Sequence, residues 1–196
     1  MLEKKIKVGD DASWLPRKEG ELTGSGGLIE VPGTVLEGYA TKYLPFIPNA
    51  ISAVHSGGLD VISYNFSGCL MAAYTAQDGR RMVCHVSTGE GNDCKSAWDQ
   101  IRSTSTNVLE FRPSDYIDTK GRSLAGCYGL ITNDDRSLAI TVVSGKDPSS
   151  RFISAITVVS GKDPSSRFIS AITVVSGKEP NSRFISAIKK MRFWRD

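Results

Sequence analysis

The chain has 196 residues, of which 40% are hydrophobic and 23% are charged. These proportions are typical of a globular protein, so they exclude a fibrous chain and wholesale disorder. The formal net charge is only +3, from 24 basic and 21 acidic residues. Because the basic residues form no dense stripe that could neutralise several phosphates, nucleic acid is not the expected partner.

The N-terminus shows no cleavable targeting signal. Residues 1–10 carry charge but lack the apolar segment of about 7 to 15 residues that a secretory signal needs. No apolar run is long enough for a membrane span. The four cysteines could form two disulfides, but a chain of this size and apolar content does not need them. We expect a cytoplasmic protein, and export without a cleavable signal into the cytosol of a host cell would leave the same pattern.

Two regions are predicted from composition. Residues 1–33 are expected to be a poorly structured leader, because residues 9–33 are rich in Gly, Ser, Asp and Pro and carry no sustained period. The apolar content rises from Val35 onward. Residues 34–196 are therefore predicted to form a single domain, which suits the length of the chain.

The central part of the chain predicts short strands and one helix. Alternating apolar residues indicate strands over 59–65, 70–76 and 82–87, with Asp78-Gly79 as the turn between the last two. A helix is expected from an N-cap at Asp93, with Trp98 and Ile101 on one face, to about residues 103–106. Residues 108–111 and 124–132 indicate further strands.

A 16-residue unit occurs three times in residues 139–186. The copies at 139–154 and 155–170 are identical, and the copy at 171–186 differs only at Glu179 and Asn181. Each copy joins a β-rich stretch to a turn sequence, which predicts an antiparallel meander. Since sixteen is even, every copy keeps the same residues on the same face. Removing two copies leaves 196 − 32 = 164 residues, which we expect to be a complete domain.

These elements predict the fold class. We expect an α+β domain that is mostly β, with sandwich-like mixed sheets flanked by helices and the tandem repeat as a C-terminal antiparallel meander. The repeated strands could also supply edges for association into a homo-oligomer.

Cys69 and His85 are the candidate catalytic residues. Cys69 follows Ser67-Gly68, where glycine permits a sharp turn whose backbone amides can stabilise an oxyanion. His85 comes 85 − 69 = 16 residues later, across the predicted hairpin. An imidazole can deprotonate a nearby thiol and so create a nucleophile. The other histidine of the chain, His55, is a reserve candidate in a predicted loop.

The geometry of the hairpin decides whether this pair can meet. A two-residue turn at Asp78-Gly79 pairs positions that sum to 157, which puts Cys69 and His85 on opposite faces. A three-residue loop or a bulge brings them to the same face. The catalytic pair therefore requires an irregular hairpin, or a Cys69 that precedes the regular strand. In the alternative interpretation Cys69 is a small buried hydrophobe and His85 a hydrogen-bonded strand residue.

A metal site is not expected. Cys84 and His85 are adjacent on a strand and point to opposite faces, and Cys94 forms no spaced Cys-x-x-Cys pair with another cysteine. We predict neither a metal nor a cofactor.

The segment Phe66-Ser-Gly-Cys69, followed after a strand-like stretch by Val83-Cys-His85-Val-Ser-Thr-Gly89, resembles the Cys-His glutamine deamidases of the cytotoxic necrotizing factor type. Those enzymes carry a Ser-Gly-Cys motif and a downstream His in a His-x-Gly-Thr segment. The chemoreceptor glutamine deamidases are similar, with a Gly-Ser-Cys variant. The resemblance covers residues 66–89 and implies a β-sandwich flanked by helices, a nucleophilic Cys69 and a base His85.

The resemblance also implies a function. It predicts a secreted bacterial toxin or effector that deamidates a glutamine side chain of another protein, with a small GTPase as the target. Two alternatives stay open, namely another cysteine hydrolase or acyltransferase, and a non-enzymatic, self-associating β-domain in which Cys69 is structural. Besides the pair itself, the candidate residues for binding the oxyanion or orienting the base are Ser67, Gly68, Ser63, Asn65 and Thr88.

Overall fold

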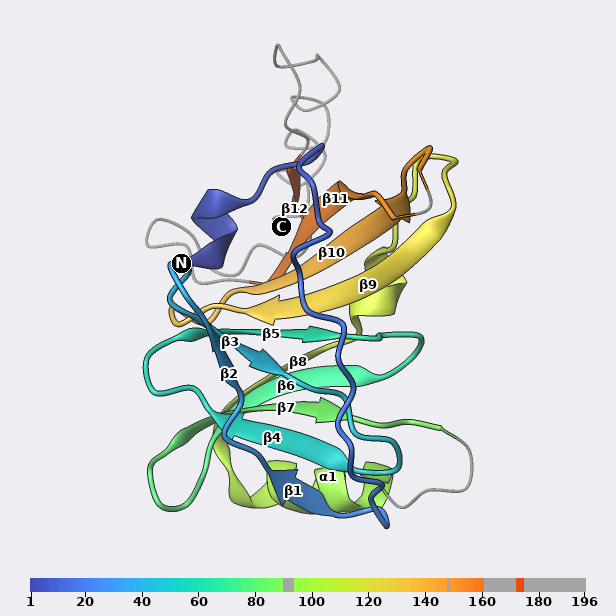
Figure 1. Cartoon of the computed structure of the whole chain (residues 1–196). Coiled ribbons are helices and arrows are strands. Elements are labelled where there is room, and N and C mark those ends of the chain that lie inside the picture. Colours follow the sequence, from blue (N-terminus) through green and yellow to red (C-terminus); the bar gives the residue numbers. More distant parts are fainter. Residues whose placement is uncertain (90–93, 148, 161–171, 175–196) are drawn as a thin grey trace, which may run out of the picture.

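The protein is α+β and mostly β, with two mixed sheets packed face to face and one α-helix among the residues described (Figure 1). This computed structural model describes residues 1–89, 94–147 and 149–160, and the backbone of residues 172–174. The fold class agrees with the prediction from the sequence. In the described part of the chain, no helix is both long and apolar enough to cross a membrane.

The larger sheet has seven strands in the order β12-β11-β10-β9-β5-β3-β2. Neighbouring strands are antiparallel, except that β3 and β5 are parallel. Its strands are β2 (Thr34–Leu36), β3 (Thr41–Leu44), β5 (Asp60–Tyr64), β9 (Leu124–Ile131), β10 (Ser137–Ser144), β11 (Arg151–Ser160) and β12 (Ile172–Val174).

The smaller sheet has five strands in the order β1-β4-β7-β6-β8, of which only β1 and β4 form a parallel pair. One face of this sheet packs against the helix α1 (Cys94–Thr104), through a cluster that includes Trp98, Cys84 and Ala72. The strands are β1 (Leu28–Glu30), β4 (Ile51–His55), β6 (Leu70–Thr75), β7 (Arg81–Val86) and β8 (Thr106–Phe111).

The core between the sheets follows from the alternation of strand side chains. Met71, Ala73 and Val83 point from the smaller sheet toward Val61 and Ile131 of the larger one, and all five are buried. Their neighbours along β6 and β7 point the other way, toward α1. Because each face of the smaller sheet is covered, its strands are apolar on both sides, as in other sheets buried on two faces.

The loop between β6 and β7 has three residues, 77–79. The Ala76 amide donates to the Arg80 carbonyl at 3.0 Å, and Gly79 takes a φ of +83°, where glycine is strongly favoured. The register therefore pairs Met71 with His85, and paired positions sum to 156 rather than 157. This loop length puts Cys69 in phase with His85, because it lies two residues before Met71.

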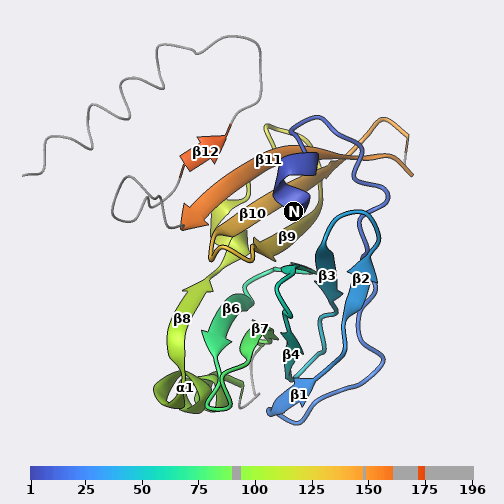
Figure 2. The same ribbon diagram turned by 90° about the vertical axis from the view of Figure 1, so that its left-hand side faces the viewer.

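The N-terminal segment, residues 1–27, covers the outer face of the larger sheet before the chain reaches β1 (Figures 1 and 2). Its regular secondary structure is one short 3-10 helix, η1 (Leu2–Lys5), yet Leu2, Ile6, Ala12 and Leu15 are buried. The amides of Gly9 and Ala12 donate to β11 carbonyls at 2.8 Å. The domain boundary at residue 33 stays a prediction.

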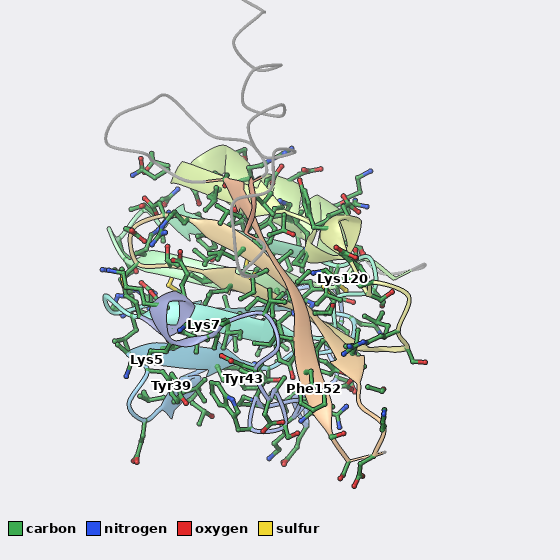
Figure 3. All side chains as sticks on the ribbon, turned by 90° about the horizontal axis from the view of Figure 1, so that it is seen from above. Lys5, Lys7, Tyr39, Tyr43, Lys120 and Phe152 are labelled. Atoms are coloured by element: carbon green, nitrogen blue, oxygen red, sulfur yellow. The ribbon has the colours of Figure 1, made fainter. Side chains whose placement is uncertain are left out.

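Side-chain contacts also fix this segment to the sheet. Lys5 lies 5.4 Å from the centre of the Tyr39 ring, and Trp14 stacks on the same tyrosine at 4.5 Å (Figure 3). The Leu2 amide donates to the buried carboxylate of Asp60 at 2.9 Å.

The repeat enters the larger sheet. The first copy supplies most of β10, its junction with the second copy forms β11, and the third copy supplies β12. Successive pairs β10–β11 and β11–β12 are antiparallel. The other repeat residues, 161–171 and 175–186, lie outside the described residues, so a meander over the whole repeat stays a prediction.

Most predicted elements of the central region are present. The strands at 59–65, 70–76, 82–87, 108–111 and 124–132 correspond to β5, β6, β7, β8 and β9. The helix ends at Thr104 as expected, whereas its predicted N-cap, Asp93, lies outside the described residues. Strands β1 to β4 were not predicted, because three to five residues are too few to show a clear period. All four cysteines are free and buried.

Candidate functional site

Cys69 lines a cleft of about 930 Å³ at one end of the smaller sheet. The side chain is 8% exposed, so its sulfur is only just within reach of solvent. Strand ends, the first turns of α1 and the end of β8 form the walls. The lining residues are Phe46, Ser67, Gly68, Cys69, Leu70, Val86, Ser87, Thr88, Gly89, Lys95, Trp98, Asp99, Arg102, Glu110 and Arg112.

The turn before Cys69 leaves backbone donors without acceptors. Gly68 has a φ of +134°, a conformation that residues with a Cβ rarely adopt, and its carbonyl accepts a hydrogen bond from Thr88 Oγ1 at 3.0 Å. Among the described residues, the amides of Ser67, Gly68 and Cys69 donate to no protein acceptor. These three residues line the cleft, so their N–H groups are available to a substrate oxygen.

His85 lies fully buried between the two sheets, next to Ser63 of β5. Its Nδ1 is 2.8 Å from Ser63 Oγ, and the same hydroxyl lies 2.7 Å from the Leu44 carbonyl oxygen. A hydroxyl has one proton, and the Leu44 carbonyl can only accept it. Ser63 must therefore accept from His85 Nδ1–H, which leaves the lone pair on Nε2. That Nε2 atom is buried and has no hydrogen-bond partner.

Aromatic rings enclose the imidazole. Phe66 stacks on it with ring centres 4.0 Å apart and planes 7° apart, and Phe46 approaches at 4.9 Å. Burial among these groups lowers the pKa of His85 from 6.5 to about 3, because a charged imidazole would lose its hydration. The ring is therefore neutral near pH 7.

The structure brings Cys69 and His85 to the same side of the β6–β7 hairpin without joining them. No hydrogen bond links the two, and His85 does not line the cleft. Phe46 both lines the cleft and packs against the imidazole. Proton transfer between them would require Cys69 or Phe46 to move.

The other candidate residues occupy different places. Ser67 and Gly68 line the cleft, and Thr88 bonds to Gly68 rather than to His85. Asn65 donates to the Glu19 carboxylate at 2.8 Å, so it does not orient the imidazole either. His55 is exposed and pairs with Met82, at the end of β7 far from the cleft.

Charged residues form one wall of the cleft, which the sequence analysis did not identify. Arg102 of α1 is bound by Asp99 at 2.8 Å and by Glu110 of β8 at 3.2 Å. Glu110 also accepts from Trp98 Nε1 at 2.9 Å. Helical spacing could have indicated that Lys95, Trp98 and Arg102 share a face, but β8 joins them only in the fold.

Metal binding has no basis in the described part of the chain, where no group of three His, Cys, Asp or Glu side chains could hold an ion. Cys84 faces α1, whereas His85 faces the larger sheet. No family model matches this chain, and neither a curated protein nor a solved structure matches it.

Proposed function

We propose that the protein is a protein glutamine deamidase in which Cys69 is the nucleophile and His85 its base. The observation that carries this proposal is the surroundings of Cys69. The thiol lines a cleft beneath three amides without acceptors, in phase with a histidine whose Nε2 lone pair has no partner.

The proposed reaction begins when Cys69 gives its proton to His85 Nε2. The thiolate attacks the carboxamide carbon of a glutamine side chain, and the oxyanion accepts hydrogen bonds from the amides of Ser67, Gly68 and Cys69. Ammonia leaves with the proton from His85. Water then hydrolyses the thioester, which yields glutamate and restores the Cys69 thiol.

Ser63 is a positioning residue in this proposal. By accepting from Nδ1–H it selects the tautomer that can take a proton at Nε2, which is the role of the third group in other nucleophile–base pairs. The low pKa of His85 makes it a weak base in the empty cleft. We therefore expect the thiolate–imidazolium pair to form when a substrate occupies the cleft.

The resemblance to toxin deamidases suggests the setting of this reaction. The substrate would be a glutamine of another protein, for example a small GTPase, in the cytosol of a host cell. The rival function is a binding domain with a structural Cys69, and the absent hydrogen bond between Cys69 and His85 favours it.

The experiment compares the wild-type protein with Cys69→Ser, which keeps the shape of the side chain. Each is incubated with a dialysed eukaryotic cell lysate, and ammonia release and glutamine-to-glutamate conversion are measured by mass spectrometry. We expect conversion only with the wild type and a strong loss in His85→Gln. Equal conversion with wild type and Cys69→Ser would exclude the deamidase, and modified glutamine without free ammonia would indicate an acyltransferase.

A further inference from the structure

The cleft beside Cys69 is unequally charged. Its lining holds three cations, Lys95, Arg102 and Arg112, and two carboxylates, Asp99 and Glu110. Both carboxylates are bound to Arg102, and Glu110 also binds Trp98. Within the described chain Lys95 and Arg112 form no ion pair, so they are the uncompensated charges of the cleft.

These two cations come from different elements. Lys95 is in the first turn of α1, and Arg112 directly follows β8. Both side chains are exposed, so neither needs an internal partner to balance its burial. An arginine presents a planar group of donors that matches a carboxylate, and a lysine adds a flexible point charge.

We propose that the cleft binds an acidic polypeptide segment, with substrate carboxylates at Lys95 and Arg112 beside the glutamine that reaches Cys69. This substrate class rests on the proposed function, but the charge preference of the cleft can be measured without catalysis. Arg102 keeps the paired Asp99 and Glu110 from repelling such a segment.

The first test uses two alkylating reagents of similar shape, anionic iodoacetate and neutral iodoacetamide. In each case the Cys69 thiolate displaces iodide, and peptide mapping separates Cys69 from the other three buried cysteines. The ratio of the two rate constants is compared with the ratio for the same thiol in the unfolded chain. We expect the folded protein to favour iodoacetate by about three- to tenfold at low ionic strength, and less in high salt.

Matched variants identify the cations responsible. Lys95→Gln combined with Arg112→Gln should return the ratio to that of the unfolded chain. Lys120→Gln combined with Arg122→Gln removes two exposed cations outside the cleft and should leave it unchanged. A folded ratio equal to the unfolded one, or an equal effect of both double variants, would overturn the proposal.

A second test does not depend on thiol reactivity. Cys69→Ser is titrated with the capped tripeptides Glu-Gln-Glu and Lys-Gln-Lys while NMR follows the side chains of Lys95 and Arg112. Preference for the acidic peptide, lost in the cleft double variant, supports the proposal, whereas equal affinity or no binding of either overturns it. A charge preference without glutamine conversion would refute the deamidase alone, and conversion without a charge preference would refute only the acidic substrate.

Discussion

At the scale of single residues, His85 differs most from its state in an unfolded chain. Its imidazole exchanges water for two phenylalanine rings, and Nε2 finds no partner. A buried polar atom without a hydrogen bond costs about 1–3 kcal/mol. Ser63 satisfies the other nitrogen, so the histidine is held in one tautomer but not fully stabilised.

The pH dependence of stability should report this burial. The folded pKa of His85 is about 3, whereas the unfolded value is 6.5, so below pH 6.5 the unfolded chain binds a proton that the folded chain does not. Stability is thus lost as pH falls. Between pH 7 and 5, His85 should reduce the free energy of unfolding by about 2 kcal/mol. Urea titrations should show this loss in the wild type and in His55→Gln, but not in His85→Gln; equal losses in all three would contradict it.

Ser63→Ala should release the tautomer of His85. The change removes the acceptor of Nδ1–H, and we expect a destabilisation of about 1–3 kcal/mol together with a mixed tautomer in ¹⁵N NMR spectra of the imidazole. Ser52 is a close control, since it is buried directly across from His85 on β4 but bonds to the Pro45 carbonyl. Ser52→Ala should cost stability and keep the tautomer. A single unchanged tautomer in Ser63→Ala would contradict the assignment.

At the scale of secondary-structure elements, the loop between β6 and β7 controls the site. Its three residues shift the pairing by one position relative to a two-residue turn, and this shift changes which face every side chain of one strand occupies. The shift puts Cys69 on the side of His85. The left-handed conformation of Gly79 makes this loop possible.

Gly79→Ala should therefore lower the free energy of unfolding by about 1 kcal/mol, because a Cβ disfavours a positive φ. A Cβ at this position would meet nothing within 4 Å, so the cost lies in the backbone alone. Gly27 is the matched control, since a Cβ there also meets nothing within 4 Å but its φ is not positive. Chemical denaturation should find Gly27→Ala neutral or slightly stabilising. Equal effects of both would contradict this explanation.

At the scale of the whole molecule, the N-terminal segment and the tandem repeat both complete the larger sheet. The N-terminal segment covers its outer face and bonds to β11, while β11 itself spans a junction between two copies of the repeat. Since the copies have an even length, removing two of them keeps every remaining strand residue on its face.

Deleting residues 155–186 should give a soluble, cooperatively folded chain of 196 − 32 = 164 residues. Ala187 and Ile188 then replace Ala155 and Ile156 without change, while residues 189–192 replace 157–160. This places lysine where Thr157 is 6% exposed. With no β12 beside it, β11 would be an edge strand, where lysine is common. A single sigmoidal urea transition is expected, and a broad transition with exposed apolar surface would contradict the prediction.

The sequence by itself determined the local elements and the two reactive residues of the candidate site. Period-two alternation located β5, β6, β7, β8 and β9, and helical spacing located α1, because both signals lie within a few consecutive residues. Cys69 and Gly68 were identified from their neighbours along the chain. Ser63 was one of three orienting candidates, since nothing local distinguished it from Asn65 or Thr88.

Only the tertiary structure decided how these parts meet. It selected Ser63, which reaches His85 from the opposite sheet, and it joined Lys95 and Arg112 into one cleft. It also chose the three-residue loop that brings Cys69 and His85 into phase. Each of these outcomes depends on packing between residues that are distant in the sequence or on a one-residue choice of register, and neither leaves a local pattern that can be read from the chain.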